Sequence, residues 1–232
     1  MTAGLLGGVL AADEPFVRWD WVSDHTDEIV EALWQHVQLT VVAVAIGFAL
    51  ALAMALVVTR WRWTFGPLAG FAAVVYAIPS LALFGVLVAM PAFGLGFRTA
   101  EVALVSYTLL ILLRNIVAGL DGVPPATREA ADGMGFERWR RLTAVDLPLA
   151  APVIIAGLRI ATVTTVGLVT VAGLVSAGGF GELITDGLGR NFSTPIVVGA
   201  VGSVVLAVAF DLAFVVAERL LTPWARVRVR RP

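Results

Sequence analysis

Two long stretches without a charged residue constrain the fold of this chain more than any other feature. Residues 32–59 contain no Asp, Glu, Lys or Arg, and the same is true of residues 63–97. A helix needs about 20 apolar residues to cross the ~30 Å hydrocarbon core of a bilayer, so each stretch can hold a membrane span. The chain is 14% charged, whereas soluble domains average about 25%. The sequence therefore predicts an all-α, polytopic helical membrane protein.

Hydropathy predicts about five membrane-spanning helices, at residues 34–58, 65–90, 99–120, 149–175 and 194–218. Pro79 lies inside the second; proline kinks a helix, but neighbouring helices can satisfy the backbone groups that it frees. Around the spans we distinguish three parts: an extracytoplasmic N-terminal segment at 1–33, a transmembrane domain at 34–220 that includes a cytoplasmic loop at 125–147, and a basic cytoplasmic tail at 221–232.

The distribution of arginine predicts the orientation. Cytoplasmic segments of membrane proteins carry an excess of basic residues. With the N-terminus outside and the C-terminus inside, only Arg18, Arg98 and Arg190 lie outside. Ten arginines then lie inside: Arg60, Arg62, Arg128, Arg138, Arg140, Arg141, Arg226, Arg228, Arg230 and Arg231. The acidic N-terminal stretch would lie outside, as either a solvated tail or a docking surface.

The residue types present exclude several functions. The chain contains no cysteine, and all of its basic residues are arginines. A P-loop needs a lysine on the phosphates, so any ATP chemistry has to belong to a partner. His25 is expected outside and His36 near the outer interface, which argues against a histidine-dependent catalytic site in the membrane. We therefore expect no catalytic, metal or cofactor site on this chain.

Charge is concentrated in the internal stretch "REAADGMGFERWRRLTAVDLP" at residues 128–148. Its pattern predicts two short helices, because Gly135 supplies the left-handed residue that commonly ends a helix. The second helix is amphipathic, with Phe136 and Trp139 on one face, and Pro148 is expected to end it. One interpretation is an amphipathic helix that rests on lipid headgroups; the other is a protein-docking element.

This loop resembles the EAA signature of the permease subunits of type I ABC importers. Glu129-Ala130-Ala131 is followed at the signature spacing by Gly135, by Val145 where the signature has Ile, and by Leu147-Pro148. The resemblance implies that the loop forms coupling helices that seat in a cleft on an ATPase subunit. The expected coupling residues are Glu129, Ala130, Ala131, Gly135, Phe136, Arg138, Trp139, Leu147 and Pro148.

Similarity extends over residues 34–220, through stretches such as "YAIPSLALFGVLVAMPAFGLG" and "LVSAGGFGELITDGL". These resemble the branch that imports glycine betaine, choline, carnitine and related osmoprotectants. The resemblance implies a bacterial cytoplasmic-membrane permease without enzymatic activity. Its expected partners are two ATPase subunits that hold ATP and Mg, a second permease, an extracytoplasmic solute-binding protein and membrane lipids, but no nucleic acid.

Three alternatives remain at this point. The permease could carry another small solute, such as methionine. An ATP-independent secondary transporter would be expected to contain inverted repeats, which the sequence does not display, and it would leave the loop unexplained. A membrane-embedded enzyme would need a cluster of acidic or histidine residues, which the sequence does not suggest.

Three charged residues are expected at membrane depth: Arg114, Arg159 and Asp211. Charges inside a membrane are costly unless they are paired or face water. We therefore expect Asp211 to pair with Arg159 or with Arg114 in the cytoplasmic half, either as a static ion pair or as a latch of the inner gate.

A polar stripe along the fourth span favours a pathway wall, although close helix packing is the alternative. The two tyrosines lie within spans and could contact a cationic solute by cation–π interaction. The expected pathway residues are Tyr76, Pro79, Ser80, Tyr107, Thr162, Thr165, Gly173 and Ser176.

Overall fold

The structure, a computed structural model, describes residues 15–224, and within that range it is helical and contains no strand. The first 14 residues of the predicted N-terminal segment and residues 225–232 of the basic tail lie outside the described residues. The helices are α1 (Trp19–Asp24), α2 (Thr26–Arg60), α3 (Phe65–Ala77), α4 (Ser80–Ala89), α5 (Phe97–Asp121), α6 (Pro125–Gly133), α7 (Arg138–Arg141), α8 (Leu147–Ala172), α9 (Phe180–Arg190) and α10 (Ser193–Leu221).

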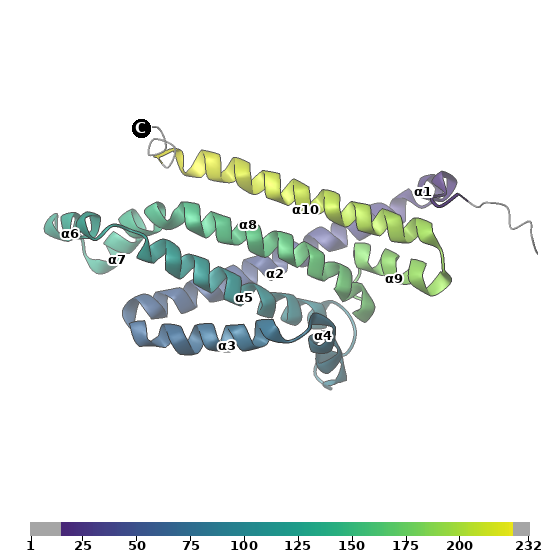
Figure 1. The fold of residues 1–232 in the computed structure, drawn as a ribbon, viewed down its shortest axis with the longest axis horizontal. Helices are drawn as coiled ribbons and strands as arrows, with labels where there is room; N and C mark the ends of the chain where they lie inside the picture. The colour runs from purple at the N-terminus through teal and green to yellow at the C-terminus, as the bar shows by residue number, and fades with distance from the viewer. Residues whose placement is uncertain (1–14, 225–232) are drawn as a thin grey trace, which may run out of the picture.

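Helices α2, α5 and α8 pack against one another and form the centre of the molecule (Figure 1). Small residues allow the close approach of α2 and α5: a Cβ at Gly47 would stand 1.8 Å from Oγ1 of Thr108. Close helix packing of this kind is typical of membrane proteins, where small residues replace the large apolar side chains of soluble cores. Both helices run from the end that carries α1 and α9 to the end that carries α6 and α7.

Four of the described helices are long and apolar enough to cross a membrane, and a bent pair would make a fifth span. Helices α5 and α10 match the predicted spans at 99–120 and 194–218, and α8 matches the span at 149–175. Helix α2 extends the first span backwards to Thr26, which places residues 26–33 of the predicted N-terminal segment in the same helix.

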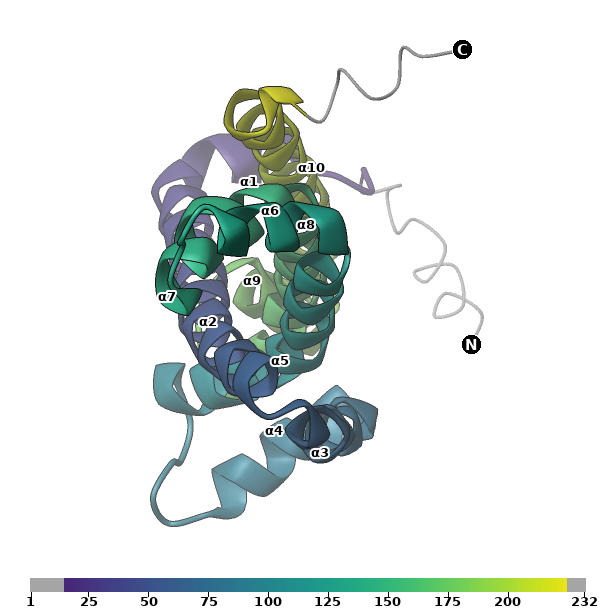
Figure 2. The ribbon, with the colours of Figure 1, turned by 90° about the vertical axis from the view of Figure 1, so that its left-hand side faces the viewer.

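The second predicted span is not one helix. Its two parts, Arg62–Ala77 and Ser80–Ala89, meet at an angle of 91°. The break follows from Pro79, because a proline disfavours helical backbone in the residue before it, and Ile78 is extended with ψ of 128°. The distortion predicted at Pro79 within the span at 65–90 is therefore confirmed, and it takes the form of a sharp break between two helices. Helices α3 and α4 lie at one side of the bundle (Figure 2).

Pro148 does not end the second loop helix, contrary to the prediction. Residues Arg138–Val175 form one continuous helix that includes α7, a π-helical segment (Leu142–Asp146) and α8. Pro148 lies in the first turn of α8, directly after the π segment. A proline in a helix leaves the carbonyl four residues earlier without a donor, and the wider π turn accommodates that mismatch: the Leu147 N–H donates to the Leu142 carbonyl, five residues back.

Candidate functional site

The charged loop forms a compact helical unit across one end of the α2–α5–α8 bundle (Figure 2). Helix α6 begins at Pro125, a favourable first position because proline lacks the donor that this position leaves free. The chain then turns at Gly135, whose φ of 80° lies in the left-handed region as predicted. The Phe136 N–H donates to the Ala131 carbonyl at 3.1 Å and closes this turn. Two helical pieces are thus held at a fixed angle.

Ion pairs brace this unit from inside. Asp146, which is 5% exposed, accepts a hydrogen bond from Nε of Arg128 at 3.2 Å and lies 3.6 Å from Nε of Arg141. Arg141 also donates from Nη1 to Oδ1 of Asp132 at 2.6 Å. Because Arg128 and Asp132 belong to α6, these contacts fix α6 against α7 and the start of α8. A network of this kind holds the loop in one arrangement more firmly than isolated surface pairs would.

The surface of the unit offers apolar and charged groups to solvent. Met134 is 69% exposed and Trp139 is 66% exposed. Glu129 and Ala130 are exposed as well, whereas Ala131 is buried. Exposed large apolar side chains beside charges are typical of a surface that receives a partner. Among the expected coupling residues, Phe136, Leu147 and Pro148 are half-buried, and Arg138 is exposed.

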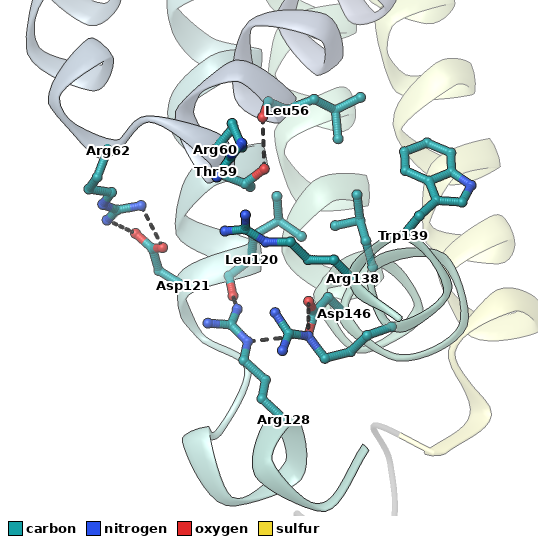
Figure 3. A pocket seen from close by; sticks show the side chains of 12 residues that line it. Leu56, Thr59, Arg60, Arg62, Leu120, Asp121, Arg128, Arg138, Trp139 and Asp146 are labelled. Carbon is teal, nitrogen blue, oxygen red and sulfur yellow. Dashed lines mark hydrogen bonds and ion pairs between the residues drawn. The ribbon is translucent and has the colours of Figure 1, made fainter. Parts of the chain in front are cut away.

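Behind the loop lies a cavity of about 580 Å³ between the ends of α2 and α5 and the loop helices (Figure 3). Arg62 at its edge forms a bidentate ion pair with Asp121, with 2.8 Å between Nη1 and Oδ1. This pair ties the segment after α2 to the last residue of α5. Sequence reasoning missed it, because no pattern relates positions 59 residues apart.

The structure joins two of the three predicted intramembrane charges. Arg159 of α8 binds Asp211 of α10 through Nε and Nη2, with 2.7 Å between Nη2 and Oδ2. Of the two partners considered for Asp211, Arg159 is the one in contact. Arg114 of α5 is exposed on the surface of the single chain and has no carboxylate partner among the described residues.

Four of the expected pathway residues gather at the break between α3 and α4. The Tyr107 hydroxyl donates to the carbonyl of Ile78, the residue before Pro79. Tyr76 packs edge-on against Tyr107, with ring centroids 5.9 Å apart, and is 40% exposed. Pro79 and Ser80 begin α4 at the same place. The broken span therefore offers an exposed aromatic ring at mid-length of α5.

The polar stripe on α8 is partly buried in the single chain, and its role as a pathway wall stays a prediction. Thr162 and Thr165 are buried, and their hydroxyls donate to carbonyls of their own helix, those of Leu158 and Ala161. Gly173 is also buried: a Cβ there would stand 2.2 Å from the backbone of Gly181. These small side chains allow close packing of α8 with α2 and α9, which was the alternative considered. Ser176, the remaining expected pathway residue of this stripe, is exposed.

Two buried groups near the other end of the bundle were not predicted. His36 is fully buried within the chain: its Nε2–H donates to the Val166 carbonyl at 3.1 Å, and its Nδ1 accepts the Phe180 N–H at 3.3 Å. It thereby links α2, α8 and α9. Glu101 is 7% exposed, and neither carboxylate oxygen has a hydrogen-bond partner within residues 15–224. A single histidine or glutamate within an apolar stretch of sequence does not reveal whether its side chain is buried in the fold.

Helices long and apolar enough to cross a membrane, a broken span with an exposed tyrosine ring and a braced loop at one end are features of the membrane subunit of a transport complex. The chain belongs to the family described as the binding-protein-dependent transport system inner membrane component, which matches residues 37–223. It is therefore a multi-pass membrane protein and a permease subunit.

Two bacterial proteins that are similar to this chain are both named as permeases. The chain is 32% identical over 206 residues to the osmoprotectant import permease protein OsmW of Salmonella typhimurium, covering 88% of this chain and 96% of that protein. It is 34% identical over 203 residues to the choline transport system permease protein OpuBB of Bacillus subtilis, covering 88% of this chain and 93% of the relative. Both alignments include nearly the whole transmembrane domain.

Among solved structures, the chain resembles that of the MetNI methionine ABC transporter in an inward-facing conformation. The TM-score is 0.75 at 21% sequence identity, and the match covers 86% of this chain and 98% of the other. At this identity the likeness establishes the fold alone.

Proposed function

We propose that this chain is the permease subunit of an ATP-driven ABC importer that carries quaternary ammonium osmoprotectants into a bacterial cell. Two ATPase subunits would hold ATP and Mg, and an extracytoplasmic protein would deliver the solute. The chain would have its N-terminus outside and its C-terminus inside, so that the α6–α7 unit lies in the cytoplasm.

The braced loop carries this proposal. A passive connector between two spans needs only a few residues, yet residues 125–146 form helices locked together by Arg128, Arg141 and Asp146. A rigid unit of this kind can pass a displacement to α8, because the helix is continuous from Arg138 to Val175. Movement of ATPase subunits that grip Met134 and Trp139 would therefore reach the membrane spans.

A second permease, either a copy of this chain or a similar one, completes the pathway in this proposal. Helix α10 supports this pairing, because only 11% of its most apolar 18-residue window is buried within the chain, so most of that window is left for other contacts. Arg114, exposed on α5 without a carboxylate partner among the described residues, would face water or the second permease. The exposed Tyr76 at the α3–α4 break would line the pathway and could contact a quaternary ammonium group by cation–π interaction.

Uptake by the reconstituted complex tests the proposal. Proteoliposomes that contain this chain, its co-encoded ATPase and its binding protein should accumulate labelled glycine betaine, choline or carnitine only when ATP is present on the ATPase side. A preference for methionine would assign the chain to the other importer considered. Uptake that persists without the ATPase would contradict an ATP-driven importer and favour a secondary transporter.

A further inference from the structure

The cavity behind the coupling loop has a strong excess of positive charge. Five arginines and two aspartates line it. Three of the arginines are paired: Arg62 with Asp121, and Arg128 and Arg141 with Asp146. The other two, Arg60 and Arg138, have no carboxylate partner in the described part of the chain. Guanidinium groups gathered in this way repel one another unless an anion joins them.

Three helices bring the arginines into this space. Arg60 is the last residue of α2, Arg128 belongs to α6 and Arg138 begins α7, and Figure 3 shows their side chains reaching the cavity from different sides. The guanidinium group is planar and donates through paired N–H groups, a geometry that matches phosphate oxygens. The arrangement is therefore suited to a phosphate group rather than to a neutral ligand.

The remaining walls of the cavity are apolar. Leu56, Leu120 and Leu142 line it from the ends of α2 and α5 and from the π segment. Trp139 also lines the cavity, and Trp61, which is 53% exposed, follows α2 directly. Tryptophan is enriched at the headgroup level of membranes. The cavity thus combines a cationic part with an aliphatic part at the depth where a span meets water.

We propose that this cavity binds the phosphate group of an acidic phospholipid such as phosphatidylglycerol. The arginines would bind the phosphate, and the leucines would contact the glycerol backbone and the first methylene groups of the lipid. Free phosphate shares the anionic chemistry but would leave the apolar walls without a partner. Basic pockets at the cytoplasmic ends of spans are known to suit anionic headgroups. The inference rests on the proposed orientation, with the loop end at the cytoplasmic face of a membrane, and it is independent of the transported solute.

Native mass spectrometry of the full-length chain tests this inference. Phosphatidylglycerol or phosphatidylcholine is titrated into the purified chain, and the bound lipid is counted. We expect one phosphatidylglycerol to bind at least tenfold more tightly than phosphatidylcholine. The double variant Arg60→Gln/Arg138→Gln should weaken it by roughly thirtyfold, the factor that ~1 kcal/mol per arginine gives at 1.4 kcal/mol per tenfold.

Two further variants separate charge from folding. Arg98→Gln removes an exposed arginine at the other end of α5 and should leave lipid binding unchanged. Arg60→Lys/Arg138→Lys keeps the charge but loses the planar group, so it should retain part of the preference. Equal binding of both lipids, or equal loss in the Arg98→Gln control, would overturn the proposal.

Two competition measurements identify the source of the anion. Millimolar inorganic phosphate should not displace phosphatidylglycerol; if it does, the cavity takes a soluble anion and the lipid proposal is wrong. The co-encoded ATPase is added last. If the glutamine variant keeps its lipid but no longer binds the ATPase, the arginines serve that partner, and the proposal is likewise refuted.

Discussion

Replacing Gly135 by alanine should weaken the coupling loop without creating a clash. Gly135 has φ of 80°, and a Cβ there would have no atom of the described chain within 4 Å. The penalty is therefore conformational: a residue with a Cβ costs about 1–2 kcal/mol in left-handed backbone. At 1.4 kcal/mol per tenfold, the fraction of molecules with the native turn falls by roughly 5–30-fold relative to the opened turn.

The same loop provides a matched control. Gly133, two residues earlier, ends α6 with ordinary helical backbone, and a Cβ there would also meet no described atom within 4 Å. Gly133→Ala should be neutral or should stabilise α6 by up to about 1 kcal/mol, because alanine favours helix over glycine. Gly135→Asn should recover part of the loss, since asparagine tolerates left-handed backbone better than alanine.

Hydrogen exchange and transport together measure this effect. Exchange of the Gly135 and Phe136 amides, which bond to the carbonyls of Asp132 and Ala131, should quicken in Gly135→Ala and stay slow in Gly133→Ala. In the reconstituted complex, solute moved per ATP hydrolysed should fall only in Gly135→Ala. Equal exchange rates in the two alanine variants would refute the assignment of Gly135 as the residue that sets the loop angle.

Three other substitutions have defined outcomes. Gly47→Ala brings a Cβ within 1.8 Å of Oγ1 of Thr108 and should destabilise the chain by about 1–3 kcal/mol in thermal unfolding, whereas Gly167→Ala, with open space around it, should not. Asp146→Asn removes the carboxylate shared by two arginines and should speed hydrogen exchange throughout α6 and α7, and unchanged exchange would argue against bracing. Glu101→Gln should raise the thermal stability, because a neutral amide costs less to bury than a carboxylate without a partner among the described residues; a loss of stability would contradict this.

Sequence predicted the features that depend on local chemistry. Uncharged runs located α2 and the broken α3–α4 span, and hydropathy located α5, α8 and α10. Gly135 indicated the left-handed turn, because glycine is the residue for which positive φ carries little cost. Pro79 likewise indicated a distortion. Its size, a 91° bend, depends on how α3 and α4 pack against α5 and could not be deduced from the proline itself.

Features that depend on tertiary contact were missed or misjudged. The stop predicted at Pro148 assumed an ordinary α-helix, whereas the π segment absorbs the proline and continues the helix. Thr162 and Thr165 are buried in the single chain and donate their hydroxyls to carbonyls of their own helix, while their role in the pathway stays a prediction. A polar stripe has the same periodicity whether it faces water or another helix, so periodicity alone could not distinguish the two.

The continuous helix from Arg138 to Val175 has a mechanical consequence. Its 38 residues form a rod of about 57 Å at 1.5 Å per residue, so a 5° tilt about its centre would displace each end by about 2.5 Å. At the far end, the turn into α9 is held by Gln35, which accepts the Gly179 N–H at 2.9 Å, and by His36. These two hydrogen bonds lie near the far end of the helix, where the displacement caused by a tilt is largest. They would therefore be the first to lengthen when the loop end of the helix is pushed.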